Sequence, residues 1–252
     1  MGFLAPNKKG IEMKANDKMV KFILSMQSPE GGFSFSRLTP PTIEDTYFAL
    51  MALKELGAHF TDKRTKEYVK SIEPGQIYGM RTAYMFGKIC KSLGIGCMPP
   101  EIKTKPTTLS EAYYKALISD MSGHAQDAAM SPANPFKAPR TVSEAHKTIF
   151  LMKRYGIPFD RNHYVSHFQL AQNDDGGFGF FQGTTSFLEN VYHSLNGLSE
   201  LGSRPLDLKA CERFIHYCKA SNGGFGRQIL TVPSVEYTYY AVSSLNTIGR
   251  MN

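Results

Sequence analysis

Apolar residues recur along this chain at the three- and four-residue spacing of amphipathic helices, in segments separated by turns. In residues 17–27, for example, Met19, Ile23 and Met26 fall on one side of a helix. No segment carries a competing strand pattern. The periodicity predicts ten helices, over residues 17–27, 42–56, 62–72, 77–93, 108–121, 141–155, 161–172, 186–201, 207–221 and 234–248.

A longer pattern occurs three times. Each copy has Gly-Gly-Phe after one helix, a Glu at the start of the next helix and a Gly at its end. The Phe-to-Glu offset is 11 residues and the Glu-to-Gly offset is 13 residues in every copy. The copies begin at Phe33, Phe178 and Phe225 and contain Glu44, Glu189 and Glu236. Two spacings held through three copies indicate a structural repeat of paired helices.

Repeated helix pairs stack side by side and share one core. We therefore expect an all-α fold of about five helical hairpins, with the second helix of each pair in an inner ring and the first in an outer ring. The two glycines allow a tight turn, and the Phe fills the gap between hairpins. We expect residues 17–252 to form this single domain and residues 1–16 to form an N-terminal extension.

The glycine-rich segments resemble a known repeat. Residues 22–33 and 168–178 are similar to the Gln-x-x-x-Gly-x-aromatic repeat of protein prenyltransferase β subunits and squalene/terpene cyclases. The resemblance implies an α/α toroid whose central cavity takes an isoprenoid. The familiar prenyltransferase barrels use six hairpins, whereas we count five. We therefore expect a smaller ring, or an open seam that favours a homodimer or a second subunit.

The catalytic signatures of that superfamily are incomplete here. Where the prenyltransferases hold zinc with Asp-x-Cys, this chain has Glu236-Tyr237-Thr238, so a hydroxyl replaces the thiolate. The family's zinc-binding His aligns with Asn190, and His193 lies one turn deeper. We expect the usual zinc site to be absent and leave open whether rim carboxylates hold Mg²⁺. Glu236 and His193 remain candidate catalytic residues.

A second candidate site follows from the cyclases, which protonate an alkene with the middle acid of Asp-x-Asp-Asp-Thr. The nearest segment here is residues 42–46, in which Glu44 or Asp45 would be the catalytic acid. The same residues also suit a helix N-terminus, where Thr42 can cap and carboxylates face the positive end of the helix dipole. Both interpretations stay open.

Candidate substrate-binding residues come from the repeat register. Three positions after the Glu position of each inner helix stand Tyr47, Tyr84, His146, Tyr192 and Tyr239. These rings either line a cavity suited to an isoprenoid or pack between helices.

Two arginines are candidates for a diphosphate site. Arg81 takes the Glu position of the second pair, and Arg227 resembles the Gly-Arg that contacts diphosphate in the prenyltransferases. They bind a diphosphate at the inner-helix N-termini, or each pairs with a rim carboxylate. His124 and His146 are candidate general bases.

Composition narrows the function further. The formal charge of +7 favours an anionic ligand, but Lys and Arg form no basic block, so nucleic acid is not supported. The polar start and the lack of a long apolar run predict a cytoplasmic protein without a membrane span. Cys211 and Cys218 are expected to be two buried thiols on one helix.

Three functions remain. The first is a prenyltransferase-like enzyme that binds an isoprenoid diphosphate, which the aromatic ring and the two arginines favour. The second is a class II-like terpene cyclase, and the third is a toroid that binds an isoprenoid or a protein without catalysis. The incomplete signatures favour the third function.

Overall fold

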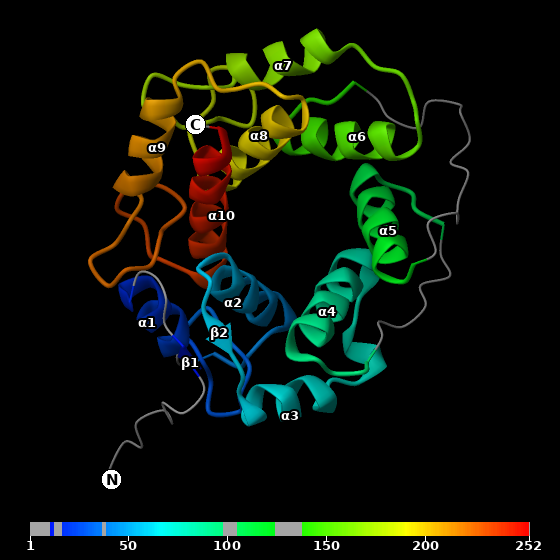
Figure 1. The fold of residues 1–252 in the computed structure, drawn as a ribbon, viewed down its shortest axis with the longest axis vertical. Coiled ribbons are helices and arrows are strands. Elements are labelled where there is room, and N and C mark those ends of the chain that lie inside the picture. The colour runs from blue at the N-terminus through cyan, green and yellow to red at the C-terminus, as the bar shows by residue number, and fades with distance from the viewer. Residues whose placement is uncertain (1–10, 13–16, 37–38, 98–104, 124–137, 252) are drawn as a thin grey trace.

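The computed structural model describes residues 11–12, 17–36, 39–97, 105–123 and 138–251 of the 252-residue chain. These residues contain ten α-helices, as the periodicity predicted (Figure 1). The helices are α1 (Asp17–Ser25), α2 (Ile43–Glu55), α3 (Lys63–Ser71), α4 (Gly79–Leu93), α5 (Leu109–Met121), α6 (Val142–Arg154), α7 (Arg161–Leu170), α8 (Leu188–Glu200), α9 (Leu208–Tyr217) and α10 (Val235–Met251). A 3₁₀ helix, η1 (Pro74–Gln76), precedes α4, and β1 (Ile11–Glu12) pairs antiparallel with β2 (His59–Phe60), a short sheet that the sequence did not predict.

Six helices form a closed inner ring. They pack in the order α2, α4, α5, α6, α8 and α10, and α10 returns to pack on α2 (Figure 1). The outer helices in the described residues are α1, α3, α7 and α9. The predicted open seam is therefore wrong. The expectation of a homodimer or a second subunit loses its basis, because the closed ring of described inner helices has no seam to cover.

The ring closes because α5, predicted as an outer helix, is the sixth inner helix. It lacks the Gly-Gly-Phe loop that follows α1, α7 and α9. On its buried side Ala112 and Ala116 are short enough to allow close packing against Leu151 of α6. The periodicity predicted this helix correctly, but the pairing rule placed it in the wrong ring.

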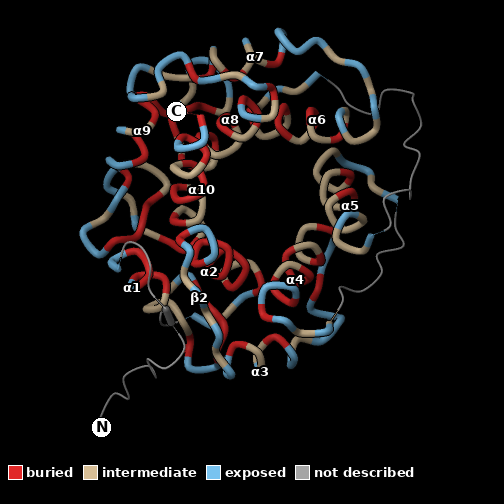
Figure 2. The backbone as a smooth tube through the Cα atoms, viewed as in Figure 1, coloured by how far each residue is buried: buried red, intermediate tan, exposed pale blue. Residues whose placement is uncertain are grey.

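Each Gly-Gly turn fastens one repeat to the next outer helix. Gly31 and Gly176 have positive φ and lie so close to the first turns of α3 and α9 that a side chain would collide with the backbone of Arg64 or Ala210. Gly223 makes the same approach to Lys18 of α1, which joins the last repeat to the first. The three repeat phenylalanines are fully buried beside these turns, as predicted. Buried residues are concentrated in the inner helices α2, α4, α8 and α10, while much of the outer loops is exposed (Figure 2).

Helix ends follow the expected chemistry, with one exception. The Oγ1 atom of Thr42 accepts the backbone N–H of Asp45 at 2.9 Å and caps α2. Gly94 ends α4 in the left-handed conformation that glycine adopts without strain. Helix α10, predicted to end at Ile248, continues through Gly249 to Met251.

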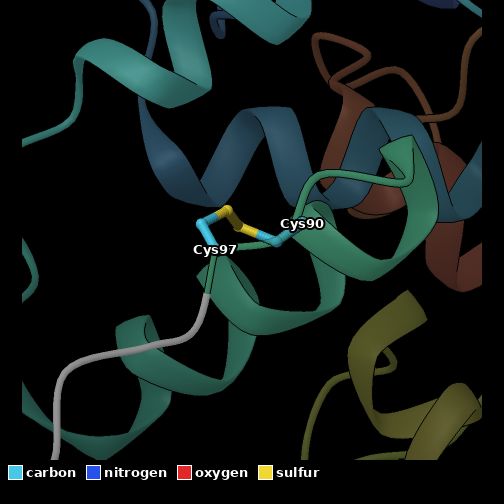
Figure 3. The surroundings of a disulfide bond; sticks show 2 residues. All are labelled: Cys90 and Cys97. Atoms are coloured by element: carbon cyan, nitrogen blue, oxygen red, sulfur yellow. A yellow bond between two sulfur atoms is a disulfide. The ribbon is translucent and has the colours of Figure 1, made fainter.

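Two cysteine pairs share a seven-residue spacing but differ in chemistry. Cys90 and Cys97 form a disulfide with a Cα–Cα distance of 5.9 Å (Figure 3). Gly94 reverses the chain between them and brings the thiols together. Cys211 and Cys218 lie along α9 and its C-cap, where seven residues span about 10.5 Å, and both are free and buried as predicted. The disulfide was not predicted from the sequence.

Candidate functional site

The inner ring encloses a cavity of about 220 Å³ to which all six inner helices contribute side chains. Tyrosine dominates its wall. The seven lining tyrosines are Tyr47, Tyr84, Tyr113, Tyr114, Tyr192, Tyr239 and Tyr240. Neighbouring rings touch at centroid distances such as 6.1 Å for Tyr47–Tyr84 and 5.7 Å for Tyr192–Tyr239. The cavity is thus walled by ring faces and edges, with phenol hydroxyls as its commonest polar groups.

Four of the five residues in the predicted aromatic register line this cavity, namely Tyr47, Tyr84, Tyr192 and Tyr239. The next position along each helix also lines it, and of the residues there the sequence analysis had singled out only His193. On these helices that position holds Phe48, Met85, His193 and Tyr240, and on α6 it holds Lys147. One residue rotates a helical position by about 100°, so two adjacent residues can share the cavity wall. His146 is buried behind the wall and does not line the cavity.

Helix α5 supplies four lining residues that the sequence analysis assigned to the outer ring. They are Ser110, Tyr113, Tyr114 and Leu117. The two adjacent tyrosines were visible in the sequence, but nothing in the periodicity distinguishes an inner from an outer helix.

Burial keeps the cavity tyrosines neutral. It raises the pKa of Tyr47, Tyr192, Tyr239 and Tyr240 well above the ordinary value, with further increases from neighbouring phenols. These hydroxyls therefore act as hydrogen-bond donors and acceptors, not as charges, at neutral pH.

Two cations, Arg81 of α4 and Lys147 of α6, line the cavity. The Nζ atom of Lys147 donates to Ser110 Oγ at 3.3 Å, and no carboxylate in the described residues lies within ion-pair distance of it. Burial, followed by repulsion from Arg81, lowers the pKa of Lys147, and the charge of Glu144 offsets only part of this. An anion in the cavity would relieve both effects.

Both candidate diphosphate-binding arginines pair with a glutamate at the N-terminus of an inner helix. Arg81 Nη1 lies 2.6 Å from Glu44 Oε1, and the two side chains are 40% and 44% exposed. Arg227 donates to Glu189 and stacks over the ring of Phe187 at 3.9 Å. Arg227 does not line the cavity, so the structure places only Arg81 where the sequence expected both.

The candidate acids lie outside the cavity wall. Asp45 accepts the hydroxyl proton of its capping residue Thr42 at 2.8 Å, and burial raises its pKa. Glu236 accepts the Tyr240 hydroxyl at 3.2 Å, and burial raises its pKa too. Glu44 is paired with Arg81. Residues 42–46 thus serve as a helix cap and rim, in line with the capping interpretation.

The positions that hold zinc in the prenyltransferases do not fit the metal here. Thr238 Oγ1 accepts the N–H of Phe225 at 3.1 Å and donates to the Ser234 carbonyl at 2.6 Å, so it fastens the repeat joint. Thr46 accepts the N–H of Phe33 in the same way. Asn190 is buried with its amide unpaired among the described residues. No group of three His, Cys, Asp or Glu residues in the described chain could hold a metal ion.

His193 and His146 contact one another through their Nδ1 atoms, which are 3.0 Å apart. His193 lines the cavity, and burial lowers its pKa well below the ordinary value. The other proposed base, His124, lies outside the described residues.

A larger groove of about 820 Å³ lies outside the ring, between the start of α2, α3 and η1. Its ionisable wall residues are Glu30, Glu44, Glu67 and Tyr68, with no Lys or Arg among its lining residues. Such a wall repels anions, so a diphosphate is better matched by the smaller central cavity.

The closed double ring and its Gly-Gly-Phe joints define an α/α toroid. The family model described as the prenyltransferase alpha-alpha toroid domain matches residues 4–82 and 120–252, so the chain belongs to this family. The match confirms the resemblance inferred from the repeat, and it begins within the predicted N-terminal extension. No protein of curated function matches the chain. The unmatched internal residues, 83–119, contain most of α5 and the disulfide.

None of the helices in the described parts of the chain has the length and apolar character that crossing a bilayer requires.

Proposed function

We propose that the central cavity binds the diphosphate ester of a short isoprenoid and that the protein transfers the prenyl group to an acceptor. The tyrosine rings would surround the hydrocarbon and stabilise positive charge on it through their faces. Arg81 and Lys147 would bind the diphosphate, with Arg81 near the rim formed by the inner-helix N-termini.

The observation that carries this proposal is Lys147. A partly buried ammonium group is costly when no carboxylate in the described residues lies within ion-pair distance. The more distant charge of Glu144 favours the ammonium, but burial and the second cation of the cavity, Arg81, outweigh it. Proteins retain such groups where a ligand supplies the missing charge. The aromatic wall indicates, in addition, that the ligand has an apolar or cationic part.

Cavity size limits the isoprenoid. The volume of about 220 Å³ is below the roughly 300–1,000 Å³ of sites for drug-sized ligands. A dimethylallyl or geranyl chain therefore suits it better than farnesyl or geranylgeranyl.

A cyclase that uses Glu44 or Asp45 as its acid is less well supported. Glu44 is paired with the guanidinium of Arg81, and neither carboxyl lines the cavity. A toroid that binds the same ligand without turnover shares the binding step and differs only in catalysis.

The test is the melting temperature of the pure protein with dimethylallyl, geranyl, farnesyl and geranylgeranyl diphosphate, with inorganic diphosphate as the control. A ligand at about 100 times its Kd stabilises the folded state by about 2.7 kcal/mol. We expect a shift with the two shorter esters that exceeds the shift with inorganic diphosphate. No shift with any ester at millimolar concentration would refute the proposal.

A further inference from the structure

A series of polar side-chain contacts leads from the cavity wall toward solvent, and His193 and His146 stand in the middle of it. His193 Nε2 lies 3.2 Å from Ser143 Oγ, and the Nδ1 atoms of His193 and His146 are 3.0 Å apart. On the far side, His146 Nε2 lies 3.5 Å from Glu200 Oε1. The His146 side chain is 6% exposed and the Glu200 side chain 31% exposed, so the chain runs from the cavity wall through the interior to a carboxylate that reaches solvent.

One arrangement of protons satisfies all four groups while both rings are neutral. An ionised Glu200 can only accept, so His146 donates from Nε2 and its Nδ1 becomes an acceptor. His193 then donates from Nδ1, and its Nε2 accepts the hydroxyl proton of Ser143. Every donor in this series of four groups therefore points toward Glu200.

We propose that His193 is the catalytic base of the cavity and that His146 and Glu200 relay the proton to solvent. This inference rests on the proposed function, with a hydroxyl or thiol group as the acceptor. A bond forms between C1 of the prenyl group and the acceptor atom, while the C1–O bond breaks and diphosphate leaves with the electron pair. The acceptor proton passes to His193 Nε2, from which the Ser143 hydroxyl has turned away.

The remaining transfers keep the proton count balanced. The Nδ1 proton of His193 moves to Nδ1 of His146, and the Nε2 proton of His146 moves to Glu200. Glu200 then releases one proton to water, which equals the proton taken from the acceptor. The turnover leaves His193 protonated at Nε2 and His146 at Nδ1, so both rings must exchange these protons with water to regain their starting tautomers before the next turnover. His193 is the group that touches the acceptor, whereas Ser143, His146 and Glu200 position it and carry its proton.

The surroundings explain why a relay is needed. Burial, then His146 and Lys147, disfavours a lasting imidazolium at His193. Passing the proton on leaves both rings neutral and hands the proton to Glu200, whose side chain is 31% exposed and can release it to water. The other ionisable side chains against the pair are Tyr113, which packs on His146, and Tyr192, which packs on both rings. Phenols are neutral near pH 7, and burial raises the pKa of both of these further.

Histidine NMR tests the proton arrangement directly and needs no turnover. The full chain is labelled with ¹⁵N-histidine, and the two rings are assigned with His193→Gln and His146→Gln variants. Two-bond ¹H–¹⁵N couplings then identify each tautomer. We expect neutral rings at pH 7, with His193 protonated at Nδ1 and His146 at Nε2. An Nε2–H tautomer at His193, or a charged ring at pH 7, would overturn the relay.

Kinetics test the relay in the complete protein. The assay follows diphosphate release from geranyl diphosphate with a thiol acceptor. His193→Gln should lower the rate by about 10²-fold or more, as loss of a general base does. Glu200→Gln should lower kcat and change its pH profile while geranyl diphosphate binding stays unchanged, which a merely structural role would not produce. An unchanged rate and pH profile in Glu200→Gln would overturn the relay.

The two proposals fail in different ways. If no prenyl diphosphate binds, the proposed function is wrong whatever the tautomers are. If geranyl diphosphate binds but the tautomers run the other way, the binding site stands and the relay is wrong.

Discussion

Arg81 of α4 and Glu44 of α2, which are 37 residues apart in the sequence, form an ion pair with 2.6 Å between Nη1 and Oε1. The sequence suggested opposite roles for them, since Arg81 was a candidate for diphosphate and Glu44 a candidate acid. Their pairing holds the Arg81 side chain, which lines the cavity, against the start of α2. Under the proposed function, this pair belongs to the rim that binds the diphosphate and does not donate a proton.

The first prediction concerns Glu44→Gln. Removing this carboxylate frees Arg81 for a phosphate, so we expect geranyl diphosphate to bind as tightly as in wild type or up to about fivefold more tightly. Because exposed pairs contribute only about 0–1 kcal/mol, the variant should keep nearly wild-type stability. Binding titrations and thermal melts measure both quantities, with Glu67→Gln in the outer groove as the control. Loss of product with binding intact in Glu44→Gln would instead support an acid role for Glu44, and loss of binding would contradict the prediction.

The second prediction concerns the closure of the ring. Gly223→Ala places a methyl group against the backbone of Lys18 in α1, in addition to the cost of its positive φ. Gly57→Ala carries a similar positive φ with open space around it, so it should cost only about 1–2 kcal/mol. We expect Gly223→Ala to lower the free energy of unfolding by clearly more than Gly57→Ala in urea denaturation. Equal effects would show that this joint does not hold the ring together.

The third prediction concerns the cysteines. Burial raises the pKa of the Cys211 thiol and raises that of Cys218 to about 12, so neither forms a reactive thiolate near pH 8. A thiol reagent should find almost no thiols in the native protein, two after unfolding and four after unfolding with a reductant. Four thiols without reductant would contradict the disulfide between Cys90 and Cys97.

The thiol count also bears on the predicted cytoplasmic location, which the structure does not test. Disulfides persist mainly in oxidising compartments. A protein isolated from cells under thiol-trapping conditions with the Cys90–Cys97 bond intact would therefore argue against that prediction.

The fourth prediction concerns pH and Glu236. Burial raises the pKa of this carboxyl, so the folded state holds its proton to a higher pH than the unfolded state does. Between the ordinary value of about 4.3 and the raised pKa, the folded state binds more protons, and the contribution of Glu236 to stability falls as the pH rises. Glu236→Gln should remove this loss and melt a few degrees above wild type at pH 7, while Glu67→Gln should not. A variant that melts below wild type at pH 7 would show that the charged form is stabilised.

The sequence predicted much of the fold because the repeat spacing is set by packing. Gly31, Gly176 and Gly223 are needed where the backbone of a turn approaches the next outer helix. Their spacing in the sequence therefore marks where one repeat packs against the next. The ring assignment of α5 could not be predicted, since an amphipathic period does not say which face of a helix meets a cavity. The disulfide was missed because its geometry depends on the chain reversal at Gly94.

The candidate site was predicted in outline only. The register of Tyr47, Tyr84, Tyr192 and Tyr239 reaches the cavity because equivalent inner helices present equivalent faces. Lys147 was missed because it stands one position after that register, and the contact between His146 and His193 joins residues 47 apart in sequence. Pairing across helices depends on side-chain directions that the sequence pattern does not contain.

The most direct test of the central claim is a titration of tyrosine fluorescence with geranyl diphosphate. The chain has no tryptophan, and seven of its 13 tyrosines line the cavity. A ligand in the cavity must therefore change the emission. We predict a saturable change that Arg81→Ala weakens by roughly tenfold or more, the loss of about 1.4 kcal/mol, and that Arg227→Ala leaves nearly unchanged. No change at millimolar ligand, or equal affinity in wild type and Arg81→Ala, would contradict a diphosphate site in the cavity.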